Sequence, residues 1–519
     1  MISARGVTRM AVVAAMVLLA VPALAGETHW ILPPPTVGDW FEPGNWENGV
    51  PDPGDSAYID NGGTAALASG DSASADYLYV GNLNSGNYLQ TGGTATFGST
   101  SPGSRHVYVG TDPGSTGAIT VQGGSFTCGG QLAVGNSGTG VFRQTGGLVS
   151  SSNTVALGFL GSGDGTYEIS GNSQLEVAGF WVGRYGTGRV IQDGGSVTSN
   201  DQIALGHSSP TGPADGTYEL RSGMVSAKVF VSGFEGQGSV LQSGGTMSIT
   251  GYSSIDYLGL VIGSCSKSHG TYQLTGGCLL VEYKCYIGLY GNGEIEQSGG
   301  TTDFESDLLV GAYAQKYEID YATGTYNQSG GTNRIRGKLY VGYGGAHGQY
   351  TLCGGINTVD TDLVIGYGDH ADGTYQVASG ELAVDGLLQV GRLGLGCFEV
   401  HGTSGTVSAS SYEQNTRGTL ISVIDGTGIS AIDVKGEATL GGTWTVLDNG
   451  ACFGRFDVLS SGGGLSGIFE NVNLPSSDWS YGIDGNVVWV QHVPEPATLS
   501  LLAAGLALLR RKRVSEGKR

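Results

Sequence analysis

The sequence predicts an all-β protein, a single-stranded parallel β-helix (β-solenoid) of about 13 coils with a β cap at each end. Glycine supplies 95 of the 519 residues, against roughly 7% in an average protein, and charged residues make up only 13%. A four-residue motif recurs thirteen times at intervals of 23 to 31 residues. Between its copies, hydrophobic and polar residues alternate as in a half-buried strand. This composition excludes a mainly helical enzyme, and the absence of a strict Gly-X-Y period excludes collagen.

The recurring motif, called the tetrad below, is a hydrophobic residue, a variable residue, a second hydrophobic residue and glycine. Glycine at the end of each copy permits positive φ where the chain turns a corner. Ser232 is expected to be the one break in this glycine column. The copies are Leu78–Gly81, Val107–Gly110, Leu132–Gly135, Val155–Gly158, Phe180–Gly183, Ile203–Gly206, Val229–Ser232, Leu260–Gly263, Cys285–Gly288, Leu308–Gly311, Leu339–Gly342, Leu363–Gly366 and Leu388–Gly391.

A second strand is expected between successive tetrads, typified by residues 324–331. Its inward column is aromatic or branched aliphatic in all thirteen coils, and the column two residues later is glutamine or aliphatic. Because equivalent residues recur once per coil, we expect them to stack on one another in a parallel sheet, with neighbouring strands about 4.8 Å apart. Thirteen coils therefore make a rod of roughly 60 Å. A buried glutamine is costly unless its amide is bonded, and we expect a bond to backbone at a corner.

The first 25 residues have the pattern of a secretory signal. Arg5 and Arg9 form a basic start, residues 10–20 are apolar, and Ala23 and Ala25 make a small-x-small cleavage site. Cleavage by signal peptidase is expected between Ala25 and Gly26. The protein is therefore expected to leave the cytoplasm.

Residues 493–519 differ in composition from the repeats before them. A Pro-Glu-Pro motif is followed by an apolar stretch, 497–509, which is shorter than the 17–25 residues of a full span, and by a basic tip. This segment closely resembles the PEP-CTERM sorting signal of bacterial exported proteins. The resemblance implies transient membrane contact and cleavage by a membrane-embedded exosortase; a permanent membrane anchor is the alternative. The signal residues are Val493, Pro494, Glu495, Pro496, Arg510, Arg511, Lys512 and Arg513.

The body of the chain divides into a repeat region and two flanking caps. Residues 73–411 resemble the Gly-rich repeats shared by PEP-CTERM proteins and autotransporter passengers, and residues 412–492 resemble the β-rich closing segment of such passengers. Residues 26–72 form a Trp-rich N-terminal cap. Trp40 and Trp46 are expected to seal the first coil, the alternative being an aromatic platform for a sugar ring.

No catalytic, cofactor-binding or metal-binding residue is predicted. The seven cysteines lack metal-ligand spacing and are expected to be buried thiols, and the eight histidines are scattered. Asp164, Asp215 and Asp372 precede glycine in a recurring sequence typical of turns. The segment 369–372 has two acidic residues and a histidine but no further ligands nearby. With a net charge of −21 the chain repels nucleic acid, and no nucleic-acid partner is expected.

These observations favour an exported, exosortase-sorted structural or adhesive protein of the bacterial cell envelope, cell surface or extracellular matrix, without catalysis. Its expected partners are signal peptidase, the exosortase and a polysaccharide or matrix ligand. The alternative is a β-helix that binds or cleaves polysaccharide, which would need clustered carboxylates, or Ca²⁺ with an Arg or Lys base, on one outer face. Ice binding is a third candidate, but it needs an outward threonine ladder. In the outward column between the two inward columns of the second strand, the only threonines are Thr120 and Thr351.

Overall fold

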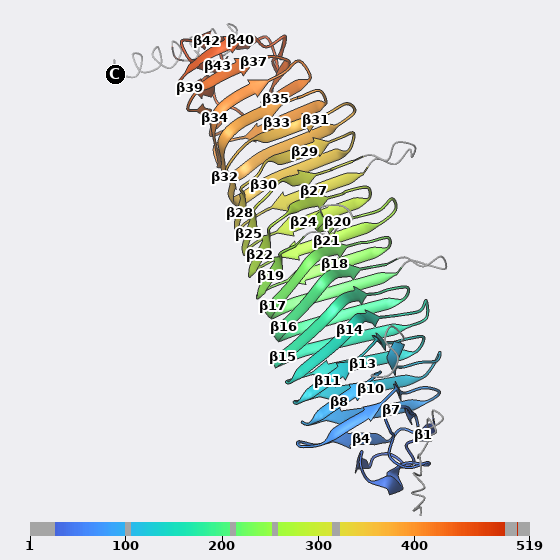
Figure 1. Cartoon of the computed structure of the whole chain (residues 1–519). Coiled ribbons are helices and arrows are strands. Elements are labelled where there is room, and N and C mark those ends of the chain that lie inside the picture. The colour runs from blue at the N-terminus through green and yellow to red at the C-terminus, as the bar shows by residue number, and fades with distance from the viewer. Residues whose placement is uncertain are drawn as a thin grey trace, which may run out of the picture.

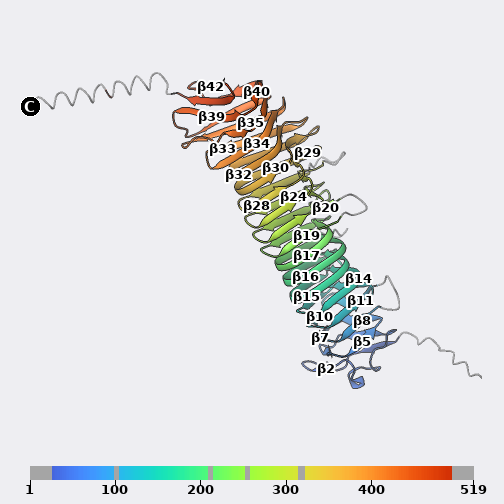
Figure 2. The same cartoon turned by 60° about the vertical axis from the view of Figure 1, so that its left-hand side comes forward.

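The protein is a rod in which the chain winds continuously from one end to the other (Figures 1 and 2). The structure is a computed structural model that describes residues 26–98, 105–207, 214–251, 258–313, 322–493 and 506. It confirms the β-solenoid, with 65% of the residues in strands and about 17 turns. The expected number was about 13. The difference arises because strands in both flanking ranges, 26–72 and 412–492, also pair in parallel with the coils.

Each turn of the rod contributes to three parallel sheets. The aromatic sheet contains the second strand of the sequence analysis, the tetrad sheet contains the tetrads, and a third sheet of short strands lies between them in chain order. The sequence pattern predicts only two strands per coil, because the third strand is short and has no constant residue type. In several coils one long strand bends through two or three sheets without a break.

The bounds of the elements follow, grouped by sheet. The tetrad sheet alone contains β1 (Glu27–His29), β3 (Ser56–Ile59), β6 (Tyr77–Val80), β9 (Arg105–Val109), β12 (Gln131–Val134), β20 (Leu258–Ile262), β23 (Lys284–Ile287), β26 (Leu308–Val310), β29 (Leu339–Tyr343), β31 (Leu363–Tyr367), β37 (Glu437–Leu440) and β40 (Gly464–Gly467). The aromatic sheet alone contains β2 (Val37–Asp39), β4 (Thr64–Leu67), β7 (Ser85–Gln90), β10 (Thr116–Val121), β13 (Thr139–Gln144), β18 (Gln237–Gln242), β21 (His269–Leu274), β24 (Asn292–Gln297), β27 (Thr323–Gln328), β33 (Leu395–His401), β35 (Gly418–Asp425), β38 (Thr443–Asn449) and β41 (Asn471–Asn473). The third sheet alone contains β5 (Ser72–Ala75), β8 (Thr94–Phe97), β11 (Ser125–Cys128), β19 (Thr246–Ile249), β22 (Cys278–Val281), β25 (Thr301–Phe304), β28 (Thr332–Ile335), β36 (Ile432–Val434), β39 (Gly454–Ser461), β42 (Trp479–Asp484) and β43 (Val487–His492). Strands that run through more than one sheet are β14 (Leu148–Leu157), β15 (Asp164–Val182), β16 (Thr187–Leu205), β17 (Asp215–Ser232), β30 (His347–Val359), β32 (Asp372–Val390) and β34 (Gly405–Gln414), and η1 (Pro43–Asn45) is a short 3-10 helix.

The inward column of the aromatic sheet stacks in the register that the sequence predicts. Each member pairs with its neighbours in the column from one coil to the next. Their exposed fractions do not exceed 1%, so together they form the central core. The members are Tyr88, Ile119, Phe142, Tyr167, Val190, Tyr218, Val240, Tyr272, Ile295, Tyr326, Tyr350, Tyr375 and Phe398.

The glycine column at the tetrad corner is unbroken, which corrects the expectation for Ser232. Phe230 pairs with Ile203 and Ser232 pairs with Leu205, so the tetrad of this coil is shifted by one residue and ends at Gly233. Ser232 occupies an inward hydrophobic position, where its hydroxyl donates to the carbonyl of Thr271 at 3.2 Å. All thirteen corner glycines have φ between +59° and +77°.

The buried glutamines bond corner backbone, as the sequence analysis expected. Gln144 is fully buried, and its Nε2 donates to the carbonyls of Gly147 at 3.0 Å and Gln174 at 2.9 Å. Its Oε1 accepts a hydrogen bond of 3.0 Å from the hydroxyl of Tyr167 in the next coil. The same tyrosine bond recurs at Gln192, Gln242, Gln297 and Gln328.

Both ends of the rod are closed, as the sequence analysis expected. Trp40 and Trp46 are buried, and the Trp40 ring packs edge-on against Tyr88 at 5.8 Å, directly beneath the core column. This burial excludes a sugar platform at the two tryptophans. At the other end, β42 and β43 form an antiparallel pair that covers the edge of β39.

Candidate functional site

The predicted processing residues lie at the two limits of the described structure. The backbone N–H of Gly26 donates to the carboxylate of Asp55 at 2.9 Å, and the N–H of Val493 donates to the carbonyl of Asp478 at 2.9 Å. The other signal residues, namely Ala23, Ala25, Pro494, Glu495, Pro496 and Arg510 to Arg513, lie outside the described residues. Within the described residues, no helix has the length and apolar character that a membrane span requires.

The cysteines and the recurring aspartates differ from their expected settings. All seven cysteines are free thiols, but only Cys128 and Cys285 are buried. Asp164, Asp215 and Asp372 each begin a strand instead of occupying a turn. The glycine after each is needed for space: a methyl group at Gly165 would lie 2.1 Å from the carbonyl oxygen of Val134.

The outer surface of the tetrad sheet is covered by a second apolar layer. The variable residue of each tetrad points outward, and in the middle of the rod eight of these side chains are nevertheless at most 7% exposed, while Trp181 and Tyr340 are half-buried. Residues that follow the corner glycines, such as Phe159, Leu289 and Tyr343, fold back over them. The buried outward residues are Ala133, Ala156, Ala204, Val231, Val261, Tyr286, Leu309 and Val364.

Aromatic rings and an arginine extend this layer along the rod. The Arg184 guanidinium lies 4.0 Å from the centroid of Trp181 and 4.4 Å from that of Phe159. His207 stacks on Phe234 at 4.9 Å. Sequence reasoning missed the layer because it treated the variable tetrad position as unconstrained. The signal was present, since that position is aromatic or aliphatic in twelve of the thirteen copies.

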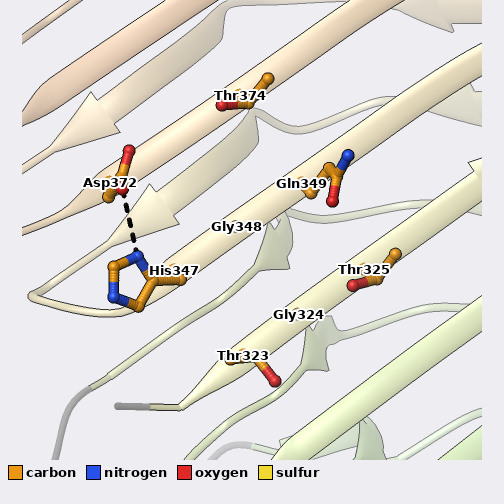
Figure 3. Close-up of a pocket in the computed structure, with 8 residues that line it drawn as sticks. All are labelled: Thr323, Gly324, Thr325, His347, Gly348, Gln349, Asp372 and Thr374. Carbon is orange, nitrogen blue, oxygen red and sulfur yellow. Dashed lines mark hydrogen bonds and ion pairs between the residues drawn. The ribbon is translucent and has the colours of Figure 1, made fainter.

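A shallow polar depression of about 320 Å³ crosses β27, β30 and β32 on the aromatic sheet (Figure 3). His347 and Asp372 reach toward each other there from neighbouring strands, with 3.2 Å between Nδ1 and Oδ2. Thr325, Gln349 and Thr374 form a second row beside them (Figure 3). One carboxylate lines this depression, so it lacks the carboxylate pair that glycoside hydrolysis requires.

Charged side chains on the edge of the third sheet bond across coils. Arg336 donates to Asp303 at 2.7 Å and Lys338 contacts Asp362 at 2.8 Å, so a basic coil lies between two acidic ones. The hydrogen bond from Arg336 lowers the pKa of Asp303 below its ordinary value. These pairs bind neighbouring turns together and leave their charges mutually neutralised.

No metal centre can be assigned in the part of the chain that the structure describes. There, no three His, Cys, Asp or Glu side chains gather as metal ligands, and this includes the segment 369–372. Comparison with protein-family models, with curated proteins and with solved structures finds no match for this chain.

Proposed function

We propose that this chain is an exported, exosortase-sorted rod with a structural or adhesive role at the cell surface or in the extracellular matrix, without catalysis. The two processing signals of the sequence support export and sorting. About 17 turns spaced by roughly 4.8 Å give a rod on the order of 80 Å. Such a shape separates its two ends and presents long continuous faces to a matrix.

The observation that carries the proposal is how the outer side chains are used. On the third sheet the charged groups pair between coils, as in Arg334 with Asp360 at 2.9 Å. On the aromatic sheet Arg143 bonds Glu168 of the next coil at 2.8 Å. On the tetrad sheet Tyr79 stacks on Tyr108 at 4.9 Å. Side chains committed to the neighbouring coil reinforce the rod along its axis, which suits a structural protein.

The contact at Gly26 supports the expected signal-peptide cleavage. Removal of residues 1–25 would turn the Gly26 N–H into an ammonium group beside the Asp55 carboxylate, where the N–H already lies 2.9 Å from Oδ1. An ion pair strengthens a hydrogen bond of this geometry. The mature chain would thus begin with a residue anchored to the first coils.

The experiment tests sorting in a bacterial host with a working exosortase. Changing Pro494, Glu495 and Pro496 to alanine should leave export intact, because the N-terminal signal is unchanged. Processing should fail, and the chain should stay in the inner membrane. Mass spectrometry should show that released parent protein lacks Arg510 to Arg513.

A matched control is available in the N-terminal cap. Residues 51–53 read Pro-Asp-Pro, so their replacement by alanine changes the same kinds of residue away from the signal. This control should be processed like the parent. A released parent protein that still ends at Arg519 would contradict the sorting proposal and favour a permanent anchor.

A further inference from the structure

The apolar outer layer of the tetrad sheet ends near the C-terminal part of the rod at a polar depression. Its volume is about 640 Å³, twice that of the depression in Figure 3. In the outward column Val364 is followed by Gln389 and then Glu413, which pair in register. Gln389 is the one polar residue at the variable position among the thirteen tetrads. The change from apolar to polar therefore coincides with the depression.

Two guanidinium groups line this depression. Arg392 lies 5.3 Å from the ring centroid of Tyr367 and donates to Gln389 Oε1 at 3.4 Å. Arg417 donates to the carbonyl of Leu393. The ion pairs among the described residues include neither arginine, and Arg392 interacts with Asp362 only at longer range, although acidic residues outnumber basic ones 45 to 24 in this chain. Each guanidinium has five N–H donors, so most of its capacity faces the depression or solvent.

Hydrogen-bond acceptors and an apolar side chain complete the lining. Gln389 is only 6% exposed, and its Nε2 donates to one oxygen of Glu413 at 3.1 Å, while Asp369 also lines the depression. Leu393 is 63% exposed and has a φ of +69°. The exposed side chain of Leu393 therefore offers an apolar surface beside the two guanidinium groups.

These groups select for one ligand chemistry. A carboxylate satisfies the two guanidinium groups, most strongly in a bidentate arrangement. Hydroxyl groups can donate to Glu413 and Asp369, and an apolar C–H face can lie on Leu393. A sugar acid has all three features on a single ring. An acidic peptide carries a hydroxyl only where Ser, Thr or Tyr adjoins the acid, whereas each uronate ring has hydroxyls next to its carboxylate, and a neutral sugar brings no anion to the guanidinium groups.

We propose that the depression lined by Gln389, Arg392, Leu393, Glu413 and Arg417 is a binding subsite for a uronate residue of an acidic polysaccharide. This inference rests on the proposed function, to which it adds the class of ligand for adhesion. The net negative charge of the rod repels any polyanion, but at physiological salt this repulsion is largely screened beyond about 8 Å, so the nearby guanidinium groups decide whether a single uronate ring is held.

The test measures binding of oligogalacturonate and oligomannuronate to the folded full-length chain by calorimetry. A methyl-esterified oligogalacturonate serves as the matched ligand, because it keeps the sugar ring and loses the charge. We expect the parent to bind at least one free acid at least tenfold more tightly than the ester. Equal affinity for acid and ester, or no binding of either acid, would overturn the proposal.

Variants locate the site. Arg392→Gln with Arg417→Gln should weaken binding at least tenfold, whereas Lys228→Gln with Lys435→Gln removes the same charge elsewhere and should not. Leu393→Gly should weaken binding while unfolding at the same or a higher urea concentration, so its effect cannot come from misfolding. Parental affinity in the double arginine variant would refute the site. A protein that is exported and sorted but binds no uronate would refute this inference alone.

Discussion

At the scale of single residues, the core combines large hydrophobic side chains with polar pairs that are fully bonded. The glutamine and tyrosine positions are correlated between coils. Gln144 shares its coil with Phe142, and the tyrosine that bonds it, Tyr167, comes in the next coil. Gln90 is followed by a coil with Ile119 and bonds Tyr88 of its own coil instead. The sequence analysis predicted the corner bond but missed the tyrosine, because it grouped all aromatic residues in one column.

The first prediction concerns this pair. Gln144→Leu should lower the free energy of unfolding, because each buried partner left without a bond costs about 1–3 kcal/mol. In the Gln144→Leu background, Tyr167→Phe should lower the free energy of unfolding by less than it does in the parent protein, because the hydroxyl has already lost its acceptor. Urea denaturation followed by circular dichroism measures both. Gln122→Leu, at an exposed position, is the control. If Gln144→Leu and Gln122→Leu lowered the free energy of unfolding equally, the prediction would be contradicted.

At the scale of elements, most tetrad strands end at the residue before a corner glycine, and β29 and β31 end at the residue after it. The sequence was sufficient to predict the parallel stacking, because equivalent residues recur at nearly constant spacing. It was insufficient for the third sheet, whose strands have only about four residues and no constant residue type. The shifted tetrad at Phe230 was misread for a similar reason: Ser232 stands at a hydrophobic position, so a search for hydrophobic residues moved the match by one residue.

The second prediction compares two glycines of positive φ. Gly183 has φ +68°, and a methyl group there would lie 2.0 Å from the carbonyl oxygen of Asp215 in the next coil. Gly114 has φ +85° with no atom within 4 Å of that methyl position. Gly114→Ala should lower stability by about 1–2 kcal/mol through backbone strain alone. Gly183→Ala should lower it much more, because two coils must also separate. Similar melting temperatures for the two variants would show that the close approach of Gly183 to the carbonyl of Asp215 contributes little to the loss of stability.

At the scale of the whole molecule, one core runs through the rod, so each turn depends on its neighbours for burial. The fold could be predicted because every coil repeats the same inward pattern. The binding subsite could not, because its residues come from different coils and follow no repeat. The departure of Gln389 from the apolar tetrad position was the available signal. It acquires meaning only beside Arg392 and Glu413 in three dimensions.

The last prediction concerns alkaline pH and depends on the core as a unit. Eight tyrosines of the described residues are fully buried, and burial raises the pKa of each above its ordinary value. They are Tyr88, Tyr167, Tyr218, Tyr272, Tyr326, Tyr350, Tyr375 and Tyr412. Burial also raises the pKa of the Cys128 thiol to about 12, which acts in the same direction.

A raised pKa in the folded state stabilises the fold below the pKa of the unfolded state, about 10 for tyrosine, and this stability is lost as pH rises further. We therefore expect the rod to keep its β structure to about pH 10 and then to unfold cooperatively. Absorbance at 295 nm should show accessible tyrosines ionising first, and the buried eight ionising together with the loss of circular dichroism. In concentrated urea all 25 should titrate near pH 10. If all tyrosines of the native protein ionised in one step while the circular dichroism of the β structure stayed unchanged, these rings would not form a continuous core.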